Sequence, residues 1–164
     1  MARTQRALIQ ALVDLALKRR YERITIQQIL DRADVGRSTF YTHFRSKDDL
    51  LLRSFEGMLA QFDGVLDAGR VVPVRELFHH IGSFRSFHDA LVRAHMIERV
   101  YQAGAEVMAV TIEKRLAARP GKVPAPVAAP ALAGALFALL RWWLETDAPY
   151  TAEQMDAMFH ALLA

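Results

Sequence analysis

Residues 25–47, TIQQILDRADVGRSTFYTHFRSK, contain two short helical patterns separated by a break. Thr25, with Gln28 three residues later, forms a capping box that starts the first helix. Asp34-Val35-Gly36 interrupts that helix, and Arg37 to Phe44 then forms a second one, with Phe40 and Phe44 on one face. Two short helices joined by about three turn residues predict a helix-turn-helix, whose second helix can enter the major groove of DNA.

The same stretch carries a longer motif. Residues 33–44 read ADVGRSTFYTHF and residues 46–50 read SKDDL. With the preceding helices, residues 4–55 resemble the N-terminal domain of the TetR family of bacterial transcriptional regulators. Asp34, Gly36 and Ser38 replace the turn glycine, the capping serine and the helix glycine of the family pattern. Asp tolerates a left-handed backbone and Gly is an acceptable N-cap, so we expect the fold to be kept.

The resemblance implies an all-α protein of about nine helices. Residues 1–46 would form a helix-turn-helix DNA-binding domain and residues 47–164 a helical effector-binding and dimerisation domain. A helix from 47 to 66 would connect the two. The first helix is expected over residues 4–20.

The resemblance also implies phosphate contacts from Thr25, Thr39, Tyr41 and Lys47. Thr25 and Lys47 lie at predicted helix N-termini, where unpaired N–H groups favour an anion. Tyr41 cannot be buried with Phe40 and Phe44, because helical geometry points it elsewhere. Pure capping by Thr25 and half-buried packing of Tyr41 are the alternatives.

Base contacts are expected from the exposed face of the second short helix. The candidates there are Arg37, Ser38 and Thr42, with Gln27 and Gln28 near by. Arg can pair bidentately with guanine and Gln with adenine, although the capping box can occupy Gln28. His43 matches the family pattern and either touches phosphate or packs.

Charge is distributed unevenly along the chain. The first fifty residues hold ten Lys and Arg against six Asp and Glu, a net charge of +4, whereas the remainder has eleven against twelve, a net charge of −1. A basic excess at the helix-turn-helix suits a polyanionic partner. Chance asymmetry of a solvated surface is the alternative reading.

The last third of the chain predicts a pair of closing helices. Residues 119–130 contain four prolines and are expected to be a linker, and Gly104 is a possible break between helices. No charge occurs between Val123 and Leu140, but the alanines and prolines argue against a membrane span. A stripe of small residues and an apolar last helix favour a homodimer interface over an ordinary core pair; its candidates are Ala131, Gly134, Ala135, Ala138, Met155, Met158, Phe159 and Leu162.

The resemblance implies a small-molecule effector, which nothing in the sequence names. The candidate pocket residues are Phe84, Phe87, His88, His95, Met108 and Trp143, each of which can equally be core. No nucleophile elbow, phosphate loop or complete metal-ligand set is present, so we expect no enzyme activity, no cofactor and no metal. The chain has no cysteine, which fits a cytoplasmic protein.

Three functions remain open at this point. The first is a ligand-responsive repressor that binds an inverted-repeat operator as a homodimer. The second is a sequence-independent or architectural DNA-binding protein, and the third is a dimeric sensor without DNA activity.

Overall fold

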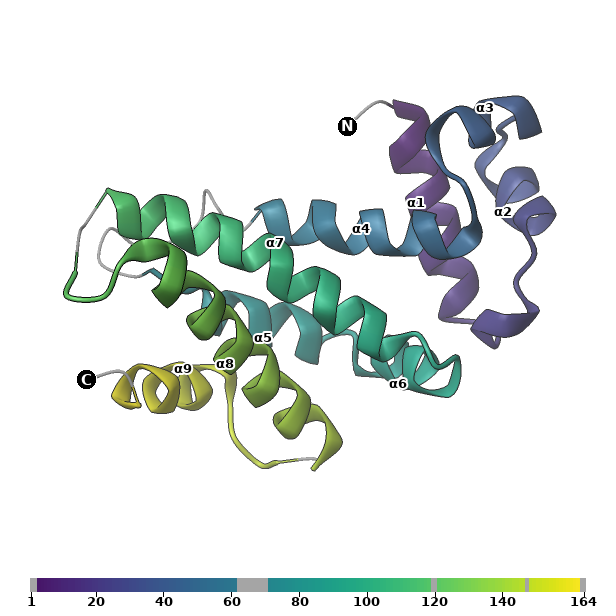
Figure 1. The fold of residues 1–164 in the computed structure, drawn as a ribbon. Coiled ribbons are helices and arrows are strands. Elements are labelled where there is room, and N and C mark those ends of the chain that lie inside the picture. The colour runs from purple at the N-terminus through teal and green to yellow at the C-terminus, as the bar shows by residue number, and fades with distance from the viewer. Residues whose placement is uncertain (1–2, 62–70, 119–120, 147, 163–164) are drawn as a thin grey trace. The chain divides into compact units, whose positions relative to one another are not determined.

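The computed structural model describes residues 3–61, 71–118, 121–146 and 148–162. These residues form nine α-helices and one 3-10 turn, with no strand among them (Figure 1), so the predicted all-α class is confirmed. In chain order the elements are α1 (Arg3–Ala16), η1 (Tyr21–Arg23), α2 (Ile26–Ala33), α3 (Arg37–His43), α4 (Lys47–Gln61), α5 (Val74–Gly82), α6 (Arg85–Arg93), α7 (Ile97–Ala117), α8 (Ala125–Glu145) and α9 (Ala152–Ala161).

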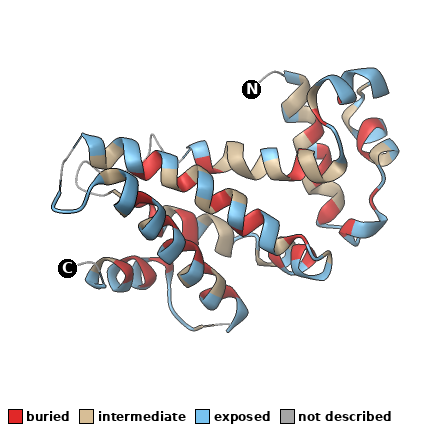
Figure 2. Ribbon diagram, in the orientation of Figure 1, coloured by how far each residue is buried: buried red, intermediate tan, exposed pale blue. Residues whose placement is uncertain are grey.

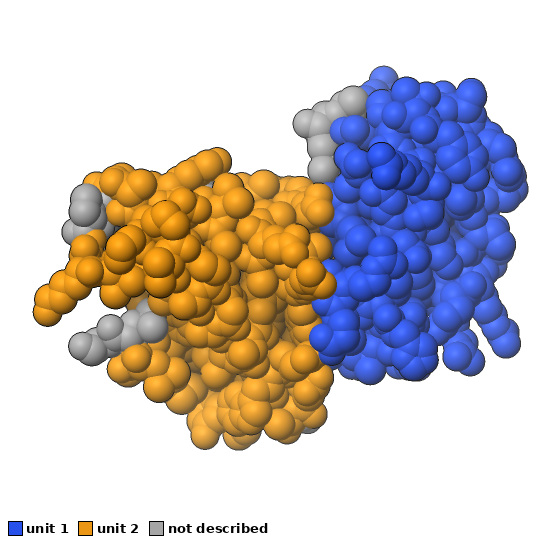
Figure 3. Space-filling model, in the orientation of Figure 1, with its two compact units in different colours: residues 1–55, 86–100 blue, residues 56–85, 101–164 orange. Residues whose placement is uncertain are grey.

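The chain divides into two compact units (Figure 3). Unit 1 comprises residues 1–55 and 86–100, and unit 2 comprises residues 56–85 and 101–164. The first unit therefore contains α1–α3 together with the start of α4, nearly all of α6 and the start of α7. Compactness does not say where a DNA-binding function ends, so the domain boundary at residue 46 stays a prediction.

Unit 1 is built around a single apolar core. Each of its helices contributes buried side chains to this core, as does Met96 between α6 and α7. Figure 2 colours the buried residues red. The largest fully buried side chains of the core are those of Leu8, Leu12, Ile29, Phe40, Leu50 and Leu51. The rings of Phe40 and Phe44 lie 5.8 Å apart, as their i, i+4 spacing predicts. Burial of Phe40 fixes which side of α3 faces outward.

The ends of α2 follow the sequence signals. Thr25 Oγ1 accepts from the Gln28 backbone N–H, and Gln28 Oε1 accepts from the Thr25 N–H, so the predicted capping box is present. Asp34 ends the helix in the left-handed region at φ 53° and ψ 50°, the conformation for which the family pattern uses glycine. His95, at φ 54°, ends α6 in the same way, which the sequence analysis did not foresee.

Unit 2 packs α5 against α8 and α9. The Phe78 and Trp143 rings lie 5.1 Å apart, and Trp143 Nε1 donates to the Tyr150 carbonyl at 2.9 Å. Gly82 lies against the same indole, since a Cβ built there would stand 2.8 Å from Trp143 Cη2. A side chain at position 82 would therefore displace the Trp143 indole from its place between α5 and α8.

Several predicted boundaries were wrong. The first helix ends at Ala16 rather than residue 20, and α7 continues through Gly104, which is buried. The expected linker over 119–130 ends early, because α8 begins at Ala125 and includes Pro130. Pro130 and Pro126 are both exposed, so the Pro126 carbonyl, which loses its helical donor, can bond to water. The predicted stretch of helix over 62–66 lies outside the described residues.

Helix α8 is long and apolar enough to cross a membrane, by length and composition alone. Of its most apolar window, 39% is buried inside the protein, and Leu136, Phe137, Leu140 and Trp143 form the buried side. A core helix of a globular protein meets the same criteria, which agrees with the prediction that this segment is not a membrane span.

Candidate nucleic-acid interface

Helix α3 has one apolar and one polar face. Phe40 is fully buried, while Tyr41 is 49% exposed and its ring meets Phe40 edge-on at 5.3 Å. The exposed residues of α3 are Arg37, Ser38, Thr39, Tyr41 and Thr42, so the structure brings these predicted contacts together on the outside of unit 1. Thr42 Oγ1 donates to the Ser38 carbonyl at 3.0 Å, and His43 is half-buried beside Phe44 at 6.2 Å between rings.

The start of α2 lies beside this face. Arg37 Nη2 donates to Gln27 Oε1 at 3.1 Å, which joins the two short helices through exposed side chains. Gln27 Nε2 in turn donates to Asp31 Oδ1 at 2.7 Å. Gln28 is bound in the capping box, so among the two glutamines Gln27 is the one directed toward the outer face of α3.

Lys47 makes close contacts within unit 1 that the sequence did not predict. Its Nζ donates to the carbonyls of Tyr21 at 2.8 Å and Ile24 at 3.0 Å and lies 4.2 Å from the centre of the Tyr21 ring. Burial lowers the pKa of this ammonium, although neighbouring Asp48 opposes the shift. Lys47 thus connects the start of α4 to the backbone just before Thr25.

A second contact between Tyr21 and the start of α4 was not predicted from the sequence. The Tyr21 hydroxyl donates to Asp48 Oδ1 at 2.7 Å, and Arg99 at the start of α7 approaches Asp48 Oδ2 at 3.4 Å. Burial and this carboxylate together raise the pKa of Tyr21 well above its usual value. A tyrosine after a run of basic residues gives no helical periodicity, so no pattern pointed to its burial.

The candidate pocket residues are divided between the two compact units. Phe87, His88 and His95 belong to unit 1, whereas Phe84, Met108 and Trp143 belong to unit 2. Met108 and Trp143 are core residues, and His95 is an exposed helix-ending residue. His88 is buried, with Nδ1 3.5 Å from Asp89 Oδ1.

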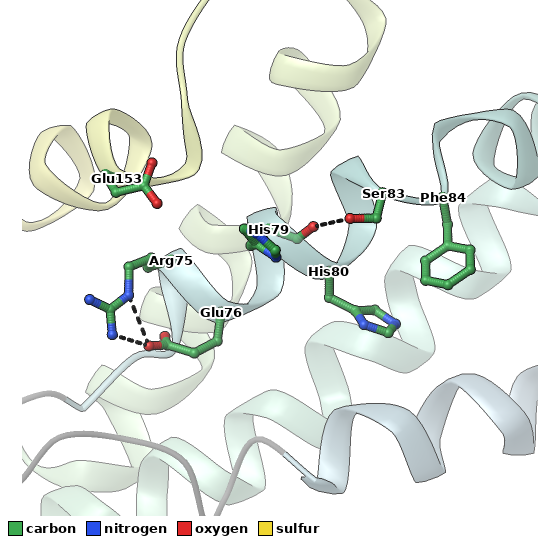
Figure 4. Close-up of a pocket in the computed structure, with 7 residues that line it drawn as sticks. All are labelled: Arg75, Glu76, His79, His80, Ser83, Phe84 and Glu153. Carbon is green, nitrogen blue, oxygen red and sulfur yellow. Dashed lines mark hydrogen bonds and ion pairs between the residues drawn. The ribbon is translucent and has the colours of Figure 1, made fainter.

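Of that set, only Phe84 lines an open hollow in unit 2, whose volume is about 630 Å³. Figure 4 shows the residues around it. The other lining residues are Arg75, Glu76, His79, His80, Ser83 and Glu153, from α5, the residues just after it, and α9. Arg75 pairs with Glu76 Oε1 at 2.8 Å, and burial, then His79, lowers the pKa of His80. Six of its seven lining residues are polar or charged types, whereas the sequence predicted mainly aromatic and apolar ones.

The candidate dimer residues fall into two groups. Ala131, Gly134, Ala135 and Ala138 are all exposed on α8, and Met158 and Leu162 are exposed at 37% and 77%. Met155 and Phe159 are buried in their own chain, so they belong to its core. A shallow apolar groove of about 290 Å³, lined by Ala135, Ala138, Leu139, Trp142, Phe159 and Leu162, lies between α8 and α9.

An all-helical chain whose helix-turn-helix presents a polar outer face on its second helix has the architecture of a DNA-binding transcriptional regulator. Residues 8–53 match the sequence model of a family described as "Bacterial regulatory proteins, tetR family". The predicted resemblance to the TetR family is therefore confirmed over these residues, which contain the helix-turn-helix.

Solved structures share the fold over nearly the whole chain. "Dihydroxyacetone kinase operon activator DhaS" matches with a TM-score of 0.72 at 17% identity, covering 98% of this chain and 94% of that one. The fatty acid degradation regulator FadR from Bacillus halodurans matches with a TM-score of 0.62 at 16% identity, covering 99% and 95%. A TetR transcriptional regulator from Streptococcus agalactiae 2603V matches at 0.58 and 23%, covering 97% and 92%. The search of curated proteins finds no match.

Proposed function

We propose that this TetR-family regulator reads a DNA sequence through α3 and binds an inverted-repeat operator as a homodimer. The observation that carries the proposal is the two-sided α3, with Phe40 fully buried and a row of polar groups outside. Thr25, Thr39, Tyr41 and Lys47 would bind phosphates, and Arg37, Ser38, Thr42 and Gln27 would read bases. His43 and Gln28 support these groups by packing and capping.

Dimerisation is proposed on the exposed face of α8 and α9. Small exposed residues at Ala131, Gly134, Ala135 and Ala138 let another helix approach closely, and the apolar groove beside them suits a dry contact. Two copies would place two α3 helices about one DNA turn apart or slightly more, which is why we expect a palindromic operator.

We propose that a small-molecule effector binds the second unit and controls DNA binding. We also propose that the protein is cytoplasmic and not an enzyme. The hollow beside Glu76 and His79 lies in the volume range of ligand sites, and its charged side chains would bind polar groups of an effector. Repression is the proposed direction of control, because a dimer bound at a promoter blocks transcription. Activation is the second candidate, favoured by the structural similarity to DhaS, an operon activator.

The decisive experiment selects bound fragments from genomic DNA with the full chain and then tests them against unrelated competitor DNA. We expect enrichment of a palindromic sequence that unrelated DNA displaces poorly. Equal displacement by any DNA would favour an architectural protein, and no retention of DNA would favour a sensor without DNA activity. Genes next to the enriched fragments would indicate the effector class, and a reporter placed behind the operator distinguishes repression from activation.

A further inference from the structure

Three exposed side chains form a hydrogen-bonded series beside α3. Asp31 Oδ1 accepts from Gln27 Nε2 at 2.7 Å, and Gln27 Oε1 accepts from Arg37 Nη2 at 3.1 Å. The opposite orientation of the Gln27 amide would place its NH₂ group against a guanidinium and its oxygen against a carboxylate. Asp31 and Arg37 therefore fix the orientation of the amide between them.

This arrangement holds the Arg37 guanidinium without neutralising it. A direct Asp–Arg pair would have to break, or would compete, when the guanidinium meets DNA. Here a neutral amide oxygen occupies one N–H of Nη2, and a guanidinium carries five such donors in a fixed fork. Arg37 is also the first residue of α3, where a recognition helix makes its base contacts.

We propose that Asp31, acting through Gln27, is a positioning residue that sharpens DNA-sequence discrimination by Arg37. The inference rests on the proposed function, since it presupposes base readout by α3. Asp31 need not touch DNA in this mechanism. It fixes the amide, and the amide fixes the plane of the guanidinium.

The effect should appear in discrimination rather than in overall affinity. Bidentate pairing with guanine needs the guanidinium fork in one plane and position, whereas a phosphate accepts it from many directions. Binding to the specific sequence must order the long Arg37 side chain, which costs conformational entropy. If that side chain is already ordered before binding, the specific complex is stabilised and the non-specific complex is not. Asp31 is itself an anion near a polyanion, so its removal should also raise affinity for every DNA sequence equally.

The test compares Asp31→Asn with Asp34→Asn in the full chain. Asp34 is another exposed carboxylate, three residues away at the end of α2, and it takes no part in the series. Asn keeps the left-handed conformation of residue 34, so this variant removes the same charge and nothing else. The probes are the duplex that the parent chain enriches from a random library and a scrambled duplex of equal length, and the readout is the ratio of their dissociation constants.

Asn can turn either its oxygen or its NH₂ group toward Gln27, so it no longer fixes the orientation of that amide. We therefore expect Asp31→Asn to lower the ratio by about two- to tenfold, the range for losing the preordering of one long side chain. Asp34→Asn should keep the parent ratio while binding both duplexes more tightly. The inference is overturned if Asp31→Asn has the same ratio of dissociation constants as the parent, or if this ratio falls equally in both variants. A parent that does not discriminate between the duplexes overturns the proposed function itself, and the inference with it.

A second comparison separates positioning from damage to the fold. In an Arg37→Ala background, Asp31→Asn should leave the ratio unchanged, because the side chain that Asp31 positions is gone. Asp31→Glu keeps the charge and the acceptor and should restore part of the discrimination. An undiminished effect of Asp31→Asn in the Arg37→Ala background would contradict the series.

Discussion

Helices α3 and α8 expose opposite kinds of surface. The exposed residues of α3 include Arg37, Thr39 and Tyr41, which carry donors that suit a charged, hydrated partner. Those of α8 include Ala131, Gly134 and Ala138, which carry no polar side-chain group at all. Each helix buries a large aromatic or aliphatic side on the opposite face.

The difference teaches that burial alone does not tell what an exposed helix face is for. A polar face is stable in water without a partner, and it would contact DNA through hydrogen bonds and charge. An apolar face of small residues gains only when another surface covers it, and close helix approach is what small residues permit. The two faces therefore call for different partners, and the following variants test each in turn.

The largest effect is expected on the buried side of α3. Phe40→Ala should lower the free energy of unfolding by about 3–5 kcal/mol, because a fully buried ring is replaced by a cavity. Tyr41→Ala, on the neighbouring exposed position, should cost much less stability yet weaken DNA binding. Chemical denaturation and DNA titration measure the two effects. Equal losses of stability in both variants would contradict the division of α3 into two faces.

The exposed side of α8 gives the next largest effect. A Cβ built at Gly134 meets nothing within 4 Å in the chain, so Gly134→Leu should leave a single copy folded. In a homodimer the same side chain would clash with the partner and weaken association by about 1–3 kcal/mol. Sedimentation over a concentration series measures the change.

Ala117→Leu, at the exposed end of α7, is the matched surface control for Gly134→Leu and should leave association unchanged. An unchanged dimer in Gly134→Leu would remove this face from the proposed interface. A parent chain that sediments as a monomer at all concentrations would remove the homodimer altogether.

Lys47 tests whether a phosphate contact can also be structural. Lys47→Ala should weaken binding to all DNA sequences and reduce the salt slope by up to about one. It should also cost about 1–2 kcal/mol of stability, because the carbonyls of Tyr21 and Ile24 lose a charged donor. Lys18→Ala removes an exposed charge beyond α1 and should change neither property. Equal salt slopes for Lys47→Ala and the parent would remove Lys47 from the phosphate contacts.

Local signals in the sequence predicted the helix-turn-helix well. Thr25 and Gln28 form a capping box, as their spacing predicts, because its bonds join residues three apart. The i, i+4 pair Phe40 and Phe44 is buried for the same reason. Exposure of Tyr41 followed from the 100° step between adjacent helical residues.

Long-range contacts could not be predicted in this way. The bond from Tyr21 to Asp48 joins residues 27 apart, and the one from Arg99 to Asp48 joins residues 51 apart. No periodicity connects such positions. Pro130 led to the wrong prediction that the linker extends to residue 130. A proline is tolerated inside a helix where the carbonyl that loses its donor can bond to solvent. The pocket candidates were chosen by residue type alone, and type does not distinguish a core residue from a ligand contact.

The smallest predicted effect concerns the turn that leads into α3. Asp34 has φ 53°, so Asp34→Gly should stabilise unit 1 by about 0.5–1 kcal/mol. This is the free energy gained by relieving the left-handed strain, minus the free energy lost because glycine gives the unfolded chain more conformational freedom. Asp34→Asn tolerates the same backbone and should resemble the parent, whereas Asp34→Ala has neither advantage and should be the least stable of the four. Thermal melting ranks them. If the carboxylate rather than the backbone governed this turn, Gly, Asn and Ala would all melt below the parent by similar amounts, and the glycine of the family pattern would have no stabilising role in this chain. A gain with Gly alone would show that the chain keeps Asp34 at some cost in stability, beside the face that we propose to bind DNA.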